Sequence, residues 1–141
     1  MRIVPVTVSD VEYVAFRLAG ERFSSSSETI PDFSTRYPNV LESCVAIPFQ
    51  SFSGKGLYPS LIAKASILFY LMNKNHPFQN GNKRLAITTL LLFLQQNGKW
   101  LRADIQELYN FTVWIAESPA GSMDHVIDAI QKFIREHLVK I

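Results

Sequence analysis

The sequence has little of several features that would place a protein in a specialised class. It contains one cysteine in 141 residues, so no disulfide can form within the chain and a reducing compartment is expected. The net charge of +2 is too small to predict a nucleic-acid-binding or membrane-binding surface. No stretch is apolar and long enough to span a membrane, and the first residues lack a signal-peptide pattern. These absences predict a cytoplasmic protein that binds neither DNA nor membranes directly.

What the chain does contain is typical of a globular domain. Hydrophobic residues make up 48% of the sequence and charged residues 18%, a balance far from that of disordered chains. At 141 residues the chain is expected to form one domain, residues 1–141. Cys44 falls within an apolar helical pattern, so we expect its thiol to pack in the core.

Apolar residues recur at helical spacing along most of the chain, which predicts an all-α bundle of about six helices. A capping box at Ser9–Glu12 is expected to start the first helix, which would end near Gly20. Trp100–Arg102 is predicted to be a short extended link. Lys64 is the one charge in an apolar helix, and we expect its ammonium to reach solvent. The other segments with helical spacing are 39–47, 59–75, 81–97, 103–117 and a last one capped by Ser122.

A polar loop separates the two most apolar of these helices. Pro77 cannot continue a helix and moves His76 out of the α region, so the preceding helix is expected to end near Asn75. The next helix then begins, and Asn80 or Asn82 is its expected N-cap. The loop therefore lies between two rigid elements in the middle of the bundle.

Lys83 and Arg84 follow in the first turn of that next helix, where two cations oppose the helix dipole. Their placement makes sense if an anion, such as a phosphate, binds the free N–H groups at the helix start. Gly81 lets the backbone approach such a ligand closely. His76 would stand at the edge of the anion site, and Phe78, flanked by polar residues, would be the buried anchor of the loop.

These residues form a known pattern. The stretch His76-x-Phe78-x-Asn80-Gly81-Asn82-Lys83-Arg84 resembles the signature of the Fic/Doc superfamily. Its ending is similar to the Doc (death-on-curing) branch, because the AMP-transferring branch has a second glycine in place of Lys83 and a further arginine where this chain has Ile87. Segments outside the motif are also similar to Doc-type chains, namely Leu41–Ser43, Leu57–Ser60, Leu90–Leu94 and Asn97–Gly98.

The resemblance implies a Fic/Doc-type helical fold with an active-site loop at residues 76–84 and a toxin-like kinase activity. Such a protein transfers a phosphoryl group from ATP or another nucleoside triphosphate to a hydroxyl of a protein, in the family a translation factor. His76 would be the catalytic base. The residues implied to bind the nucleotide phosphates are Asn80, Gly81, Asn82, Lys83 and Arg84.

Alternatives to a kinase stay open. Transfer of a whole nucleotide (AMP) is the other chemistry of the family. Mg²⁺ is an implied cofactor, but many family members carry an acidic Mg²⁺ ligand where this chain has Asn80, and a neutral amide is a weaker ligand. A weakly active nucleotide-binding or adaptor module is therefore a second interpretation. A helical domain that only binds a partner protein is a third.

Residues 48–57 combine alternating aromatic residues with a glycine turn, which predicts a short hairpin. By resemblance this hairpin is the flap over the active site, and an extended target peptide would pair with its free edge. The residues expected to contribute are Phe49, Ser51, Phe52, Ser53 and Gly54. The alternative is a connector packed by Phe49 and Phe52.

The resemblance also implies control by a second protein. Family members are often inhibited by a helix with a Ser/Thr-x-x-x-Glu-Gly/Asn pattern, and the nearest match here, Ser24 to Glu28, is followed by Thr29. The chain is therefore expected to bind an antitoxin whose tail folds into a helix. The sequence leaves open the target protein and its modified residue, the nucleotide and the oligomeric state.

Overall fold

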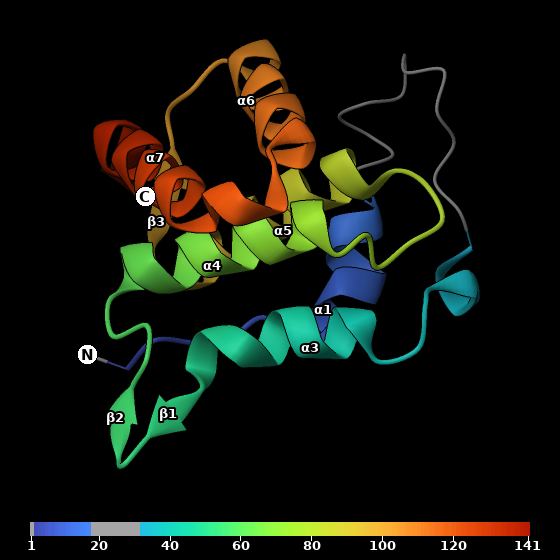
Figure 1. The fold of residues 1–141 in the computed structure, drawn as a ribbon, viewed down its shortest axis with the longest axis horizontal. Helices are drawn as coiled ribbons and strands as arrows, with labels where there is room; N and C mark the ends of the chain where they lie inside the picture. Colours follow the sequence, from blue (N-terminus) through green and yellow to red (C-terminus); the bar gives the residue numbers. More distant parts are fainter. Residues whose placement is uncertain (1, 18–31) are drawn as a thin grey trace.

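The computed structural model describes residues 2–17 and 32–141. Two central helices, α4 and α5, have α6 and α7 on one side and α1 and α3 on the other (Figure 1). The helices are α1 (Val8–Asp10), α3 (Val40–Ala46), α4 (Leu61–Lys74), α5 (Asn82–Gln96), α6 (Ile105–Glu117) and α7 (Met123–His137). Within the described residues these elements confirm the predicted all-α fold, while the assignment to one domain stays a prediction.

Shorter elements connect these helices. The helical turns are η1 (Val11–Ala15, a π-helical turn), η2 (Phe33–Thr35), η3 (Ile47–Phe49) and η4 (Ala120–Ser122). The strands are β1 (Ser51–Phe52), β2 (Lys55–Gly56), β3 (Lys99–Leu101) and β4 (Leu138–Lys140), and they form two antiparallel pairs.

The helices α4 and α5 are buried on nearly all sides. Every residue from 64 to 73 in α4 and from 84 to 94 in α5 is buried. A helix that is buried on nearly all faces is expected to be mostly apolar, which explains the composition of both helices. Ser60 starts α4 by accepting a hydrogen bond from the Ala63 N–H at 3.0 Å. Both helices lie within the predicted ranges.

The helices α6 and α7 each bury one apolar stripe against the central pair. In α7 the buried residues are Val126, Ile130 and Ile134, which follow one another at intervals of four. α6 starts later than predicted because Asp104 is its N-cap. The Ser122 side chain makes no capping hydrogen bond, so the predicted cap of α7 is not formed.

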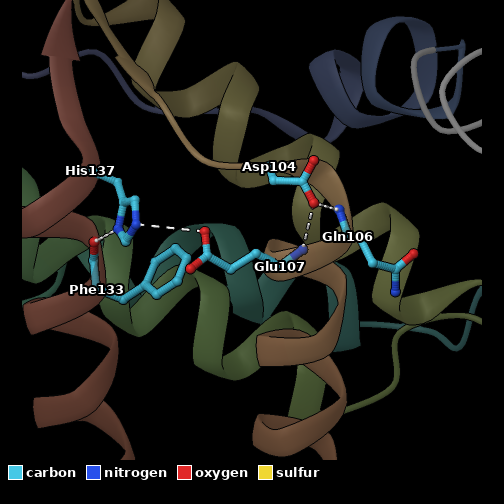
Figure 2. A network of polar contacts seen from close by, with 5 residues as sticks. All are labelled: Asp104, Gln106, Glu107, Phe133 and His137. Carbon is cyan, nitrogen blue, oxygen red and sulfur yellow. Dashed lines mark hydrogen bonds and ion pairs between the residues drawn. The ribbon is translucent and has the colours of Figure 1, made fainter.

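A polar network joins the start of α6 to the end of α7 (Figure 2). Asp104 Oδ2 accepts hydrogen bonds from the N–H groups of Gln106 and Glu107 at 3.1 and 3.3 Å. His137 Nδ1 donates to the Phe133 carbonyl at 2.7 Å, and its Nε2 lies 3.7 Å from Glu107 Oε1. The last contact becomes an ion pair when the imidazole is protonated. The network therefore holds the two helix ends beside each other.

The pairing of β3 with β4 was not predicted. The sequence analysis proposed only an extended link at Trp100–Arg102, whereas Trp100 lies opposite Val139 in an antiparallel pair. The Arg102 N–H donates to the His137 carbonyl at 2.8 Å and extends the pairing by one residue. Because two helices separate the strands in sequence, no local pattern indicates that they meet.

The predicted hairpin is present. Phe52 in β1 lies opposite Lys55 in β2, and the turn residues Ser53 and Gly54 have φ values of 53° and 80°. Left-handed conformations at both turn positions are typical of tight hairpins. At the base of the hairpin, the Phe49 ring packs edge-on against the Phe93 ring, whereas Phe52 is 74% exposed. Of the two aromatic residues expected to pack in the alternative interpretation, a simple connector, only Phe49 does so.

The prediction that the Lys64 ammonium reaches solvent is wrong. Lys64 is buried, with only 8% of its surface exposed. Its Nζ donates to the carbonyl oxygens of Pro48 at 3.0 Å and Tyr58 at 2.6 Å, and it lies 4.6 Å from the centroid of the Phe49 ring. Burial lowers the pKa of the ammonium. Since the two carbonyls lie on either side of the hairpin, Lys64 attaches both hairpin ends to α4.

The first helix begins earlier than predicted. Thr7, not Ser9, is the N-cap, because Thr7 Oγ1 accepts from the Asp10 N–H at 3.1 Å and Asp10 Oδ2 accepts from the Thr7 N–H at 2.9 Å. The capping box therefore starts two residues before the predicted one. The predicted helix end near Gly20 and the Ser24–Glu28 pattern lie outside the described residues.

The single cysteine and the length of the apolar helices bear on two of the predictions made from the composition. Cys44 is fully buried, as predicted, and burial raises the pKa of its thiol to about 12. The reactive thiolate is therefore scarce at neutral pH. In the part of the chain that the structure describes, no helix is long and apolar enough to cross a membrane.

Replacing Lys64 by Met keeps a buried stem of similar length but removes the hydrogen bonds to Pro48 and Tyr58. We expect the free energy of unfolding to fall by about 1–3 kcal/mol, because two carbonyls lose their donor. Urea denaturation measures this loss, and amide exchange in the hairpin is expected to become faster. Lys55→Met, in the exposed hairpin, is the matched control. An equal loss in both variants would contradict the role given to Lys64.

Candidate active site

His76 lies on the loop that connects the end of α4 to the start of α5. α4 ends at Lys74, and the Asn75 N–H still donates to the Leu71 carbonyl at 2.9 Å. His76 then leaves the right-handed helical region, as predicted, and adopts a φ of 48°. A left-handed conformation is uncommon outside glycine and persists where the surrounding structure imposes it. The His76 side chain is exposed and therefore accessible to an incoming molecule.

Phe78 holds the loop against the core. Its side chain is 1% exposed, and its ring centroid lies 5.2 Å from that of Phe16 and 6.2 Å from that of Phe33. Phe16 and Phe33 also contact each other edge-on at 5.3 Å, so the three rings form one cluster. Edge-on aromatic pairs add attraction to the burial of their surface. The cluster therefore fixes the middle of the loop.

Asn82 binds the backbone of the loop and does not cap α5. Its Oδ1 accepts from the Phe78 N–H at 3.0 Å, and its Nδ2 donates to the Phe78 carbonyl at 2.9 Å. The predicted N-cap, Asn80 or Asn82, is wrong, because Gly81 occupies the N-cap position with a φ of 73°. Gly81 has no side chain that could cap α5. The N–H groups of its first turn are therefore left for a ligand.

The cations Lys83 and Arg84 lie in this first turn of α5. Arg84 is 3% exposed, yet its Nε and Nη2 are buried without a hydrogen-bond partner. In the described part of the chain, the Arg36–Glu42 ion pair and the His137–Glu107 contact involve neither residue. Burial of guanidinium nitrogens without partners is costly, and the positive end of the helix dipole adds to the cost. Such an arrangement can bind an anion.

The segment before α3 lies against the loop. The Tyr37 N–H donates to the Pro77 carbonyl at 3.0 Å. Arg36 forms an ion pair with Glu42 at 3.0 Å, which holds this segment to α3. A hollow of about 390 Å³ opens beside the loop, a volume within the range of small-ligand sites. It is lined by Pro38, Asn39, Val40, Ser43 and Asn75.

The hairpin is not brought to this site. It precedes the first residue of α4, whereas His76 follows the last, and a helix of 14 residues is roughly 20 Å long. Figure 1 shows the hairpin and the α4–α5 loop at opposite ends of α4. The expectation that the hairpin covers the active site is therefore wrong. A docking role for Phe49, Phe52 and their neighbours stays a prediction without support from position.

The loop offers poor ligands for Mg²⁺. Its side-chain oxygens belong to the carboxamides of Asn75, Gln79, Asn80 and Asn82, and the Asn82 oxygen is bonded to Phe78. Among the described residues, no group of three or more His, Cys, Asp or Glu side chains could hold a metal ion. Mg²⁺ prefers charged carboxylate oxygens, so this donor set does not fit a resident magnesium ion.

The residues that support the loop from outside were not predicted from the sequence. Phe16, Phe33 and Tyr37 come from segments distant in sequence from the motif, and η2, which contains Phe33, is one short turn without helical periodicity. Their aromatic character was the only available signal, and it does not indicate which ring meets which.

Replacing Asn82 by Ala removes both hydrogen bonds to the Phe78 backbone. We expect a loss of about 1–3 kcal/mol in the free energy of unfolding, because a partly buried N–H and carbonyl lose their partners. Exchange of the Phe78 amide proton, followed by NMR, is expected to become faster. Asn80→Ala is the matched control on the exposed side of the loop, with a change below about 0.5 kcal/mol. Unchanged exchange of the Phe78 amide proton in Asn82→Ala would contradict the role given to the Asn82 side chain.

Comparisons with known proteins agree with this geometry. A family model described as the Fic/DOC family matches residues 5–94. The curated protein "Toxin Doc" of Mycolicibacterium smegmatis (strain ATCC 700084 / mc(2)155) is 36% identical over 73 residues, which are 52% of this chain and 56% of that protein. The chain thus spans about half the length of this curated relative. No solved structure matches the chain significantly.

The family match covers more than half of the chain and includes α4, most of α5 and the whole loop from His76 to Arg84. The unusual features of the site, an exposed histidine and a buried arginine on either side of an anchored phenylalanine, therefore lie inside the matched region. The chain belongs to the Fic/DOC family.

Proposed function

We propose that the protein is a Doc-like toxin that transfers the terminal phosphoryl group of a nucleoside triphosphate to a hydroxyl of a target protein. The observation that carries the proposal is Arg84 at the start of α5, a buried residue whose Nε and Nη2 have no hydrogen-bond partner. Membership of the Fic/DOC family and the similarity to a protein named Toxin Doc support it. By family resemblance the target is a translation factor, and an antitoxin is the expected partner.

The phosphates would bind at the start of α5. Lys83 and Arg84 supply two positive charges in the first turn of α5, where the backbone N–H groups have no partner within the helix. A phosphate would give Arg84 Nε and Nη2 the acceptor that these two atoms lack. Donors held in position before the reaction stabilise charge that develops during phosphoryl transfer.

His76 would accept the proton of the attacking hydroxyl. Imidazole exchanges protons near neutral pH, and this side chain is exposed at the edge of the proposed phosphate site. As the proton moves to His76, the hydroxyl oxygen bonds to the terminal phosphorus and the bond to the bridging oxygen breaks. The products are a phosphorylated protein and a nucleoside diphosphate.

Lys83 favours phosphoryl over nucleotidyl transfer. The AMP-transferring branch has glycine at this position, where the backbone can approach a ligand closely. Lys83 instead places a side chain and a second charge there, as in the Doc branch. Transfer of AMP is the alternative reaction, and a module that binds nucleotide without transfer is the alternative outside catalysis. All three can be separated by where a radiolabel goes.

The reaction is tested by incubating the protein in cell extract with γ-labelled or α-labelled ATP, side by side. We expect a labelled protein band from the γ label only, reduced at least about 100-fold in His76→Ala, because a general base contributes that much or more. His125→Ala, an exposed histidine on α7, is the matched control and should retain labelling. Transfer from the α label would reassign the chain to the AMP-transferring branch. Transfer of neither label would exclude both reactions.

Replacing Arg84 by Gln should have opposite effects on stability and on binding. Without ligand we expect the free energy of unfolding to rise by about 1–2 kcal/mol, because an unpaired buried charge is removed. Nucleotide affinity should fall by about tenfold or more, because a charged hydrogen bond to phosphate is lost. Thermal denaturation and calorimetric titration measure the two effects, with Arg102→Gln, an exposed arginine directly after β3, as control. A variant that is destabilised and still binds would contradict the anion site.

A further inference from the structure

A long stretch in the middle of the chain contains basic residues but no acidic ones. Between Glu42 and Asp104 the sequence contains no aspartate or glutamate. This stretch includes both central helices and the whole candidate site. Its charged residues are all cations, namely Lys55, Lys64, Lys74, Lys83, Arg84, Lys99 and Arg102. A divalent cation near the loop would therefore meet fixed positive charge and no carboxylate from these elements.

Acidic residues from other described segments do not supply the missing ligand set. Glu42, in α3, is bound to Arg36 at 3.0 Å, and Asp10 is bound to the backbone N–H of Thr7 and, at 3.3 Å, to Gln96. No cluster of three potential ligands exists in the described residues. Within the loop, Asn80 offers only a neutral oxygen on an exposed side chain.

We propose that this site binds nucleotide phosphates with its own cations and holds no magnesium ion. Lys83, Arg84 and the N–H groups of α5 would neutralise the phosphates directly, and any Mg²⁺ present would arrive on the triphosphate as part of the substrate. The inference rests on the proposed function, since it concerns how the same site recognises its nucleotide. It differs from the family pattern at one position, where Asn80 replaces a carboxylate.

The inference has a measurable consequence for binding. Free ATP carries more negative charge than ATP bound to Mg²⁺, so a site built only of cations and N–H donors attracts free ATP at least as strongly. A site that holds the metal behaves in the opposite way, because removal of Mg²⁺ leaves its carboxylate facing the phosphates. The sign of the Mg²⁺ effect therefore distinguishes the two designs.

The test is calorimetric titration of the full chain with ATP, once with Mg²⁺ and once with EDTA, at the same ionic strength. For the unmodified chain we expect a dissociation constant in EDTA that is no more than about threefold weaker than in Mg²⁺. For Asn80→Asp we expect binding to become Mg²⁺-dependent by about tenfold or more, because the new carboxylate both repels free phosphate and ligates the metal.

Gln79→Glu is the matched control, since it adds the same charge at the neighbouring exposed position outside the ligand slot. It should weaken binding modestly in both conditions without creating Mg²⁺ dependence. Stronger binding of the unmodified chain in Mg²⁺, by more than about threefold, would overturn the inference and leave the proposed function intact. Absence of ATP binding in both conditions would overturn the inference and the proposed function together.

Discussion

α4 and α5 are buried on nearly every face, and each is stable only while the other helices cover it. Their packing against each other leaves a connection of seven residues, 75–81, in which the chain must reverse direction. A connection this short between two buried helices has few available conformations. The left-handed backbone at His76 and Gly81 is the local consequence. The position of the site is therefore imposed by the core.

Within this constraint, Phe78 divides the loop into a buried and an exposed side. Its ring is held by Phe16 and Phe33, and its backbone is held by Asn82. With the middle of the loop fixed from both directions, His76 stays outside while the start of α5 remains uncapped. An exposed base and free N–H donors thus arise together from one anchored residue.

The positions of the helices and of the hairpin were predicted well from local sequence, whereas the helix caps were not. The apolar runs located α4 and α5, and the serine–glycine turn located the hairpin, because period and turn chemistry act over a few residues. Features that depend on distant contacts were missed. The carbonyl partners of Lys64 and the pairing of β3 with β4 involve segments that meet only in the folded chain. Asn82 shows the same limit, because an asparagine can bind backbone groups in either direction and the sequence does not say which.

The cations of the two central helices differ in their hydrogen-bond partners. Because their stretch of sequence contains no acid, Lys64 and Lys74 bind main-chain carbonyls instead: Lys64 those of Pro48 and Tyr58, and Lys74 those of Ala116 and Ser118. Arg84 is buried as deeply as Lys64, yet two of its nitrogens have no such partner. Main-chain carbonyls therefore satisfy the buried ammonium of Lys64, whereas no such carbonyl accepts from Arg84 Nε or Nη2. Burial of unsatisfied guanidinium nitrogens weakens the free protein, so stability does not explain Arg84, and the proposed phosphate would supply the missing partner.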